Sequence, residues 1–154
     1  MAVVIKVLGR GDDPVLSRVP SGVFDNPIDP ELTENFLKSP ASHRRRYRPR
    51  LVVGFASGVH YVHPDKPPQL WINEVAVAPA HRRWGLSTAV LRALLAVGQQ
   101  YNCTEAWVLT DRTNVAAMAL YASLGGIQGA DRQGPSDATL GYSFTLNCEP
   151  GKWH

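Results

Sequence analysis

The sequence predicts an α+β domain in which a central sheet is covered by helices, and two observations carry this prediction. Residues 86–100 repeat apolar side chains at helical spacing and have polar side chains on another face, which is typical of an amphipathic helix. Residues 51–62 and 70–78 are rich in strand-forming residues, and the proline-rich stretch between them predicts a hairpin. The chain has 154 residues, 44% of them apolar and 19% charged, so we expect a single domain over residues 1–154.

The N-terminal part of the chain predicts one strand and one helix ahead of the hairpin. Residues 3–8 form a short apolar segment that ends at a Gly-Arg-Gly turn, so we expect a first strand there. Asp29 and Pro30 are residue types typical of an N-cap and of the first helical position, and an acidic residue follows. A helix is therefore expected over residues 30–38.

The C-terminal part predicts a strand, a second helix and a last strand after the helix over residues 86–100. Residues 104–110 are rich in apolar residues and predict a strand. Residues 114–124 are alanine-rich and end at two glycines, which suits a helix C-cap. Residues 139–146 alternate in polarity and predict the last strand.

The net charge of +3 is a local property of one arginine-rich stretch. Five of the sixteen basic residues lie within seven positions, and without them the net charge of +3 would become −2. Tyr47 is the only aromatic residue in this stretch, so we interpret it as a solvated surface or a contact for an anion, and we expect no nucleic-acid partner. The five residues are Arg44, Arg45, Arg46, Arg48 and Arg50.

No segment predicts export or insertion into a membrane. No apolar run approaches the roughly 20 residues that cross a bilayer, and the apolar start of the chain is short and interrupted by Lys6. The two cysteines, Cys103 and Cys148, cannot form a disulfide framework. We therefore expect a cytoplasmic protein without a membrane partner.

The loop before the helix over residues 86–100 has the features of an anion site. A strand that ends near Ala78 leads into a short basic loop, and the loop opens directly into the helix. The first turn of a helix has unpaired N–H groups, Gly85 allows close approach of a ligand, and Arg82 and Arg83 add charge. A pyrophosphate would suit this site. An ordinary strand-to-helix turn with exposed arginines is the alternative.

Two motifs then resemble those of the GNAT superfamily of acyl-CoA-dependent N-acyltransferases. The stretch Arg82-Arg83-Trp84-Gly85-Leu86-Ser87 is similar to the family motif Arg/Gln-x-x-Gly-x-Gly/Ala. The stretch Asn114-x-x-Ala117-x-x-x-Tyr121-x-x-Leu124-Gly125 is similar to the second family signature. The aromatic residue that usually follows is absent, because position 126 is glycine.

The resemblance implies a GNAT-like fold, with a mixed and largely antiparallel central sheet, and acetyl-CoA as co-substrate without a metal. It implies that backbone groups of Val75, Ala76 and Val77 bind the pantetheine arm. It implies further that the pyrophosphate is held by backbone N–H groups of Arg82, Arg83, Trp84, Gly85, Leu86, Ser87 and Thr88. Asn114 would contact the cofactor, and Tyr121 would protonate the departing thiolate, although a tyrosine at this spacing can also be a core residue.

Glu74 is a lone carboxylate in an otherwise apolar strand. A buried charge is costly unless it is paired or used. An amine must lose a proton before it attacks a thioester, so Glu74 is our candidate for the base, directly or through a water, and its charge could also hold a cationic substrate. The alternative is a structural salt bridge to Arg82 or Arg112.

The acceptor is expected to be a small-molecule amine. The spacing from Gly54 through the proline-rich turn to Glu74, and on to His81-Arg82-Arg83, is similar to that of the small aminoglycoside 3-N-acetyltransferases, which typically have aspartate in place of Glu74. The helix ending Ala119-Leu120-Tyr121-x-x-Leu124-Gly125 is similar too, and the resemblance implies 3-N-acetylation and antibiotic resistance. Acidic residues that could line a pocket for such a cation are Asp25, Asp29, Glu31 and Glu34, together with Glu74. Another small amine, a protein N-terminus and a CoA-binding sensor without turnover are the alternatives, and a homodimer is compatible with all of them.

Overall fold

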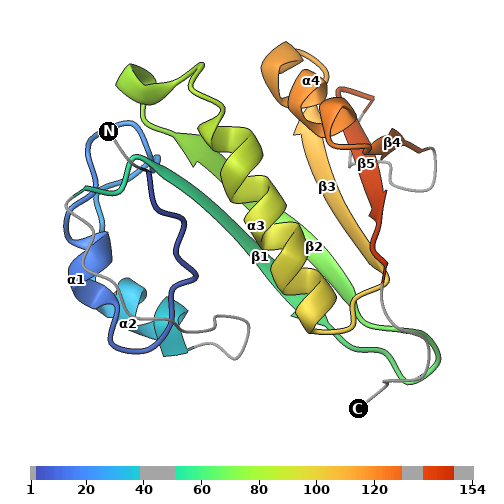
Figure 1. The fold of residues 1–154 in the computed structure, drawn as a ribbon, viewed down its shortest axis with the longest axis horizontal. Helices are drawn as coiled ribbons and strands as arrows, with labels where there is room; N and C mark the ends of the chain where they lie inside the picture. Colours follow the sequence, from blue (N-terminus) through green and yellow to red (C-terminus); the bar gives the residue numbers. More distant parts are fainter. Residues whose placement is uncertain (1–2, 39–50, 130–136, 148–154) are drawn as a thin grey trace. The chain divides into compact units, whose positions relative to one another are not determined.

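The structure is a computed structural model that describes residues 3–38, 51–129 and 137–147 (Figure 1). The helices in these ranges are α1 (Asp13–Leu16), α2 (Pro30–Lys38), the short 3-10 helix η1 (Pro79–His81), α3 (Leu86–Gln100) and α4 (Val115–Ser123). The strands are β1 (Gly54–Tyr61), β2 (Gln69–Val77), β3 (Glu105–Asp111), β4 (Ile127–Gln128) and β5 (Thr139–Thr145).

The strands form one mixed sheet in the order β1-β2-β3-β5-β4. β2 and β3 are parallel, with Ile72 opposite Val108. β5 is antiparallel to both of its neighbours: Tyr142 lies opposite Val108 of β3 and opposite Gln128 of β4. The sheet and its helices confirm the predicted α+β fold.

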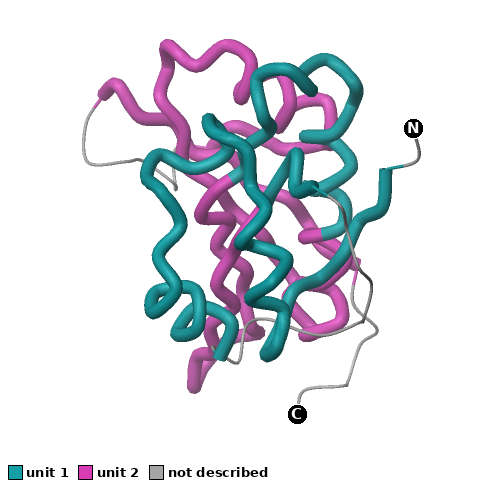
Figure 2. The backbone as a smooth tube through the Cα atoms, turned by 90° about the vertical axis from the view of Figure 1, so that its left-hand side faces the viewer, with its two compact units in different colours: residues 1–55, 75–93 teal, residues 56–74, 94–154 magenta. Residues whose placement is uncertain are grey.

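The chain divides into two compact units, each built from two separate segments (Figure 2). Unit 1 contains residues 1–55 and 75–93, and unit 2 contains residues 56–74 and 94–154. β1, β2 and α3 pass from one unit to the other, so each unit includes part of these elements. The single domain expected over residues 1–154 stays a prediction.

In unit 2, α3 and α4 lie on the same face of the sheet. A Cβ at Gly98 of α3 would lie 3.0 Å from the side chain of Leu70 in β2. In the row of Leu70, the pairing continues through Ala106 to Phe144 of β5. Phe144 in turn contacts the ring of Tyr121 in α4. Cross-strand neighbours point to one face, so both helices cover it.

In unit 1, helices lie against both faces of β1. A Cβ at Gly54 would lie 3.4 Å from Val77 and 3.9 Å from Val90 of α3, so this face of β1 meets α3. The next residue, Phe55, points the other way and packs against Phe24 and against Phe36 of α2, at 4.8 and 6.0 Å between ring centroids. This aromatic cluster anchors α2.

The burial alternation of β2 does not continue unbroken to the end of the strand. Leu70, Ile72 and Val77 are buried, although Val77 lies five positions after Ile72, which is an odd spacing. A strand with strict period-2 alternation buries positions at even spacings. The pattern therefore changes between Ile72 and Val77, the stretch that contains Glu74.

Most of the predicted elements are confirmed, and the first strand is wrong. Residues 3–8 have no regular secondary structure, and Val3, Val4 and Ile5 are exposed. The ammonium of Lys6 contacts the carboxylate of Asp12, which ties this segment to the residues that follow it. The short elements α1 and β4 were not predicted from the sequence.

Candidate active site

β2 and β3 are in register over only part of their lengths. Their parallel pairing runs from Gln69 opposite Glu105 to Ile72 opposite Val108. Both strands continue beyond this point. Glu74 is half-buried and lies two residues after the last registered pair. A backbone that continues past its registered partner strand can bind an extended ligand in the way it would bind another strand.

Tyr121 of α4 is buried against β5. Its ring centroid lies 5.6 Å from that of Tyr142 and 6.4 Å from that of Phe144. Burial raises the pKa of the Tyr121 phenol above its ordinary value of 10.0. The side chain is therefore protonated at neutral pH and able to donate a proton.

Glu74 and Tyr121 both belong to unit 2, and the sheet relates them to each other. Ile72, Val108 and Tyr142 form one row across β2, β3 and β5, and Tyr121 packs on the β5 end of this row. Glu74 lies two residues farther along β2, which corresponds to about 6.6 Å of strand. The same sheet therefore connects the two residues: Glu74 lies beyond the last registered pair of β2 and β3, and Tyr121 packs on the β5 end of the row of that pair.

The loop between η1 and α3 contains two residues with a left-handed backbone. Arg83 and Gly85 have left-handed φ values of 65° and 74°, and they flank Trp84. Alternating backbone handedness turns successive N–H groups into a concave anion site. The side chain of Arg82 braces the loop, because its Nε donates to the carbonyl of Val77 at 3.3 Å.

The start of α3 completes this cradle. The first backbone hydrogen bond of the helix runs from the N–H of Ala89 to the carbonyl of Gly85. The N–H groups of the first helical turn therefore precede the intrahelical ladder and can bind a ligand. No described atom lies within 4 Å of the position that a Cβ would take at Gly85. The residues fit a pyrophosphate, which needs an open approach and several N–H donors.

Asn114 is the N-cap of α4. Its Oδ1 accepts a hydrogen bond from the N–H of Ala117 at 3.1 Å. The amide Nδ2 group is the part of the side chain that remains to donate to a cofactor. A cofactor contact by Asn114 stays a prediction.

Two of the four acidic residues proposed for the acceptor serve α2 itself. The carboxylate of Asp29 accepts from the N–H of Leu32 at 2.9 Å, as the N-cap prediction requires. Glu34 pairs with Lys38 at 2.6 Å, and this contact lowers the pKa of Glu34. Asp25 and Glu31 are exposed.

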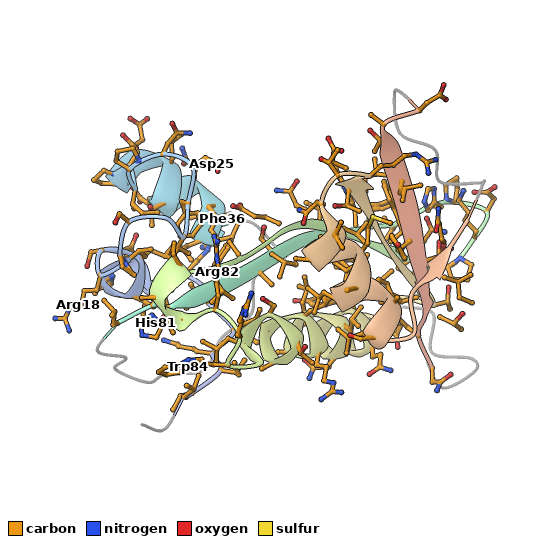
Figure 3. The ribbon with its side chains drawn as sticks, turned by 90° about the horizontal axis from the view of Figure 1, so that it is seen from above. Arg18, Asp25, Phe36, His81, Arg82 and Trp84 are labelled. Carbon is orange, nitrogen blue, oxygen red and sulfur yellow. The ribbon has the colours of Figure 1, made fainter. Side chains whose placement is uncertain are left out.

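The sequence argument missed an apolar surface on α2. Leu32 is 69% exposed and Phe36 is 40% exposed, and the two residues are one helical turn apart. Figure 3 labels Phe36 and Asp25 on this part of unit 1. The i, i+4 spacing of two exposed apolar residues was the signal that could have identified this surface.

The predicted residues are therefore grouped within the two units. Unit 1 holds the cofactor candidates from Val75 to Thr88 and the four acidic residues of the N-terminal segment. Unit 2 holds Glu74, Asn114 and Tyr121. The arginine-rich stretch and Cys148 lie outside the described residues, whereas Cys103 is buried. Among the described helices, none is long and apolar enough to span a membrane.

Comparison with protein families gives a match over most of the chain. The profile described as the Acetyltransferase (GNAT) family matches residues 25–126. A search of curated proteins finds no significant match.

Solved structures share the fold at low sequence identity. A chain of the NatC complex bound to Gag peptide and CoA is 18% identical, with a TM-score of 0.69, over 96% of this chain and 100% of the other. The ribosomal-protein-S18-alanine N-acetyltransferase from Escherichia coli is 18% identical, with a TM-score of 0.63, over 98% of both chains. The protein yncA from Salmonella typhimurium, with its cofactor acetyl-CoA, is 15% identical, with a TM-score of 0.65, over 97% of this chain and 96% of the other. The family profile covers well over half of the sequence, so the chain belongs to the GNAT family of acetyltransferases, which use acetyl-CoA.

Proposed function

We propose that this acetyltransferase acetylates a primary amine directly, with Glu74 as the base and Tyr121 as the acid. The observation that carries the proposal is the placement of Glu74 just past the registered part of β2, on the sheet that Tyr121 covers. The carboxylate accepts a proton from the amine, directly or through a water, so that the nitrogen lone pair can attack the thioester carbonyl.

Two protons leave the nitrogen of the protonated amine, and one proton is added to sulfur. Glu74 takes the first nitrogen proton before the attack and passes it to solvent, and it takes the second as the C–N bond forms. A C–N bond forms as the C–S bond breaks, and the electron pair of that bond leaves on the thiolate of CoA. The Tyr121 phenol donates its proton to this thiolate and regains one from solvent, and the products are the N-acetylated amine and free CoA. No acyl-enzyme is required, so both substrates bind before transfer.

The proposed acceptor is the α-amine of a peptide whose first side chain is apolar. The exposed Leu32 and Phe36 supply apolar surface on α2, in the segment that frames the acceptor in related enzymes. An α-amine has a pKa of about 7.7–8.0, so a single base suffices to deprotonate it near neutral pH. Among the proteins of similar fold, NatC is bound to Gag peptide and CoA, and the Escherichia coli enzyme is a ribosomal-protein-S18-alanine N-acetyltransferase. The Arabidopsis thaliana Naa50, a further neighbour in fold, is in complex with the bisubstrate analogue CoA-Ac-MVNAL.

An aminoglycoside is the second candidate, and the acidic residues favour it. A polycationic antibiotic needs several carboxylates in its pocket, and Asp25 and Glu31 are exposed carboxylates in the N-terminal segment. Asp29 and Glu34 already serve α2 as a cap and as the partner of Lys38. These local contacts leave less negative charge for a polycation, so the peptide is the stronger candidate.

A thiol-release assay with acetyl-CoA distinguishes the two acceptors. We expect CoA release with short peptides that begin with an apolar residue and none with the same peptides blocked at the N-terminus. Leu32→Asn should raise the KM of the apolar peptide, because it removes exposed apolar surface without a core contact. Acetylation of aminoglycosides alone, with KM unchanged in Leu32→Asn, would exclude the peptide and retain the antibiotic.

The proposed base is tested by substitution of Glu74. Glu74→Gln should lower kcat by about 10²- to 10⁴-fold, the usual contribution of a general base, and Glu74→Asp should restore part of the rate. Glu105→Gln is the matched control, because Glu105 is a half-buried carboxylate of the neighbouring strand that accepts from Gln69. A near-normal rate of Glu74→Gln from about pH 6 to 9 would make Glu74 structural.

A further inference from the structure

Trp84 is a large aromatic side chain that the fold leaves open to solvent. It is 60% exposed and lies in the loop between η1 and α3 (Figure 3). Its indole meets the His81 ring edge-on, with 5.4 Å between the ring centroids and 66° between the ring planes. The indole therefore offers an aromatic face that a ligand can cover.

The loop segment that precedes Trp84 is braced by two hydrogen bonds, and His81 in this segment contacts the indole. His81 ends η1, and its N–H donates to the carbonyl of Ala78 at 2.9 Å. Arg82 ties the loop to the end of β2 through the carbonyl of Val77. Pre-ordering of an aromatic platform lowers the entropic cost of stacking a ligand on it.

Trp84 also lies next to the N–H groups that fit a pyrophosphate. It stands between the two left-handed residues of the cradle, Arg83 and Gly85. In CoA, a single ribose links the pyrophosphate to the adenine base. A base that leaves this cradle is therefore within reach of the Trp84 indole.

We propose that Trp84 is the stacking platform for the adenine base of acetyl-CoA. All four bases have an aromatic face, and stacking on a tryptophan requires no hydrogen-bond readout. The inference concerns the donor substrate and is independent of the amine that accepts the acetyl group. A protein partner covering Trp84 is the competing explanation, and the experiment below separates the two.

The test measures binding of CoA and of its fragments to the whole protein by calorimetry. Trp84→Leu keeps an apolar side chain and removes the ring, so we expect CoA to bind about 5- to 150-fold more weakly, the range typical of one stacked base. Trp84→Phe should lose less affinity for CoA, because it retains a smaller aromatic ring. 4′-Phosphopantetheine lacks the adenosine and should bind the wild type and Trp84→Leu with equal affinity. Adenosine 3′,5′-bisphosphate should lose as much affinity for Trp84→Leu as CoA does.

Tryptophan fluorescence gives a second readout. CoA should quench the wild-type emission, and the quenching should disappear in Trp84→Phe but persist in Trp71→Leu, which removes a partly exposed indole from β2. Equal weakening of CoA and 4′-phosphopantetheine in Trp84→Leu would overturn the proposal, because Trp84 would then only shape the cradle. Unchanged affinity for all three ligands would also overturn it and leave a partner as the occupant.

Discussion

Tyr121→Phe separates acid catalysis from packing in a single substitution. The phenyl ring that remains keeps the contacts with Tyr142 and Phe144, which involve the aromatic faces and edges of the ring. Only the hydroxyl is lost, and among the described residues it has no hydrogen-bond partner. We therefore expect the free energy of unfolding to change by less than about 1 kcal/mol.

The expected kinetic loss is larger than the change in stability. General acids contribute about 10²- to 10⁴-fold, but a CoA thiolate is a tolerable leaving group and a water can substitute for the phenol. We expect kcat to fall by about 10- to 1000-fold. Tyr121→Ala is the packing control: it removes the ring from a buried site and should cost about 3–5 kcal/mol of stability.

The alkaline limb of the stability curve gives an independent check on Tyr121. Because burial raises the phenol pKa, the folded protein keeps this proton at a pH where the unfolded chain has lost it. The stability that the protonated Tyr121 phenol contributes is fully present below the ordinary pKa of 10.0, and it is lost as the pH rises through the higher pKa of the folded state. Tyr121→Phe should therefore lose less stability above pH 10.0 than the wild type.

Stopped-flow or steady-state kinetics and thermal unfolding of the same preparations decide the role of Tyr121. An unchanged kcat together with a lowered Tm for Tyr121→Phe would refute the reasoning and make the residue part of the core alone. The acid would then have to be another group or water.

Substitutions at Gly126 and Asn114, each with a control, test how the two ends of α4 are held. Gly126→Ala should lower the free energy of unfolding by about 1–3 kcal/mol, since its Cβ would lie 2.9 Å from the Phe144 ring. Gly129→Ala, whose Cβ would have no described contact within 4 Å, should leave stability unchanged, and equal stability of both variants in denaturant unfolding would contradict this. Asn114→Ala should lose about 0.5–2 kcal/mol with the cap, and Asn114→Ser should keep the cap and weaken only CoA binding; unaltered CoA affinity in Asn114→Ser would leave Asn114 a purely structural residue.

Helix positions were predictable because their signals are local. The bounds of α2 and α3 agree with the prediction, and Asp29 caps α2 through the N–H of Leu32 as its residue type indicates. A strand has no comparable local hydrogen bonds, since its backbone pairs only with a partner strand. Residues 3–8 have strand-like composition, but they form no regular secondary structure, and the composition alone could not reveal this.

The departure of the second motif at position 126 has a steric explanation that depends on a distant residue. A Cβ at Gly126 would lie 2.7 Å from the carbonyl oxygen of Tyr121 and 2.9 Å from the ring of Phe144. Phe144, from β5, therefore fills the space beside the end of α4, and a side chain at position 126 would collide with it. Sequence comparison records the missing aromatic residue but not the ring that takes up its place.

The burial pattern of β2 around Glu74 also could not be predicted from the sequence. The stretch from Asn73 to Ala76 mixes polar and apolar residues without a clear period, so the sequence alone did not indicate where the alternation shifts. The burial pattern of the folded strand shows that the alternation changes between Ile72 and Val77. Burial depends on what packs against the strand, which the residues of the strand do not encode by themselves.

Arg82 and Asn114 each have a structural bond that competes with the cofactor role suggested by their motifs. Arg82 uses Nε to hold the loop to Val77, and Asn114 uses Oδ1 to cap α4 at Ala117. Only the terminal nitrogens of the guanidinium and the Nδ2 of the amide are left to donate to a ligand. An alanine substitution at either position removes the brace and the donor together, so a loss of CoA affinity would not by itself identify a direct contact. A replacement that keeps the structural bond, as serine does at position 114, is the change that isolates the donor.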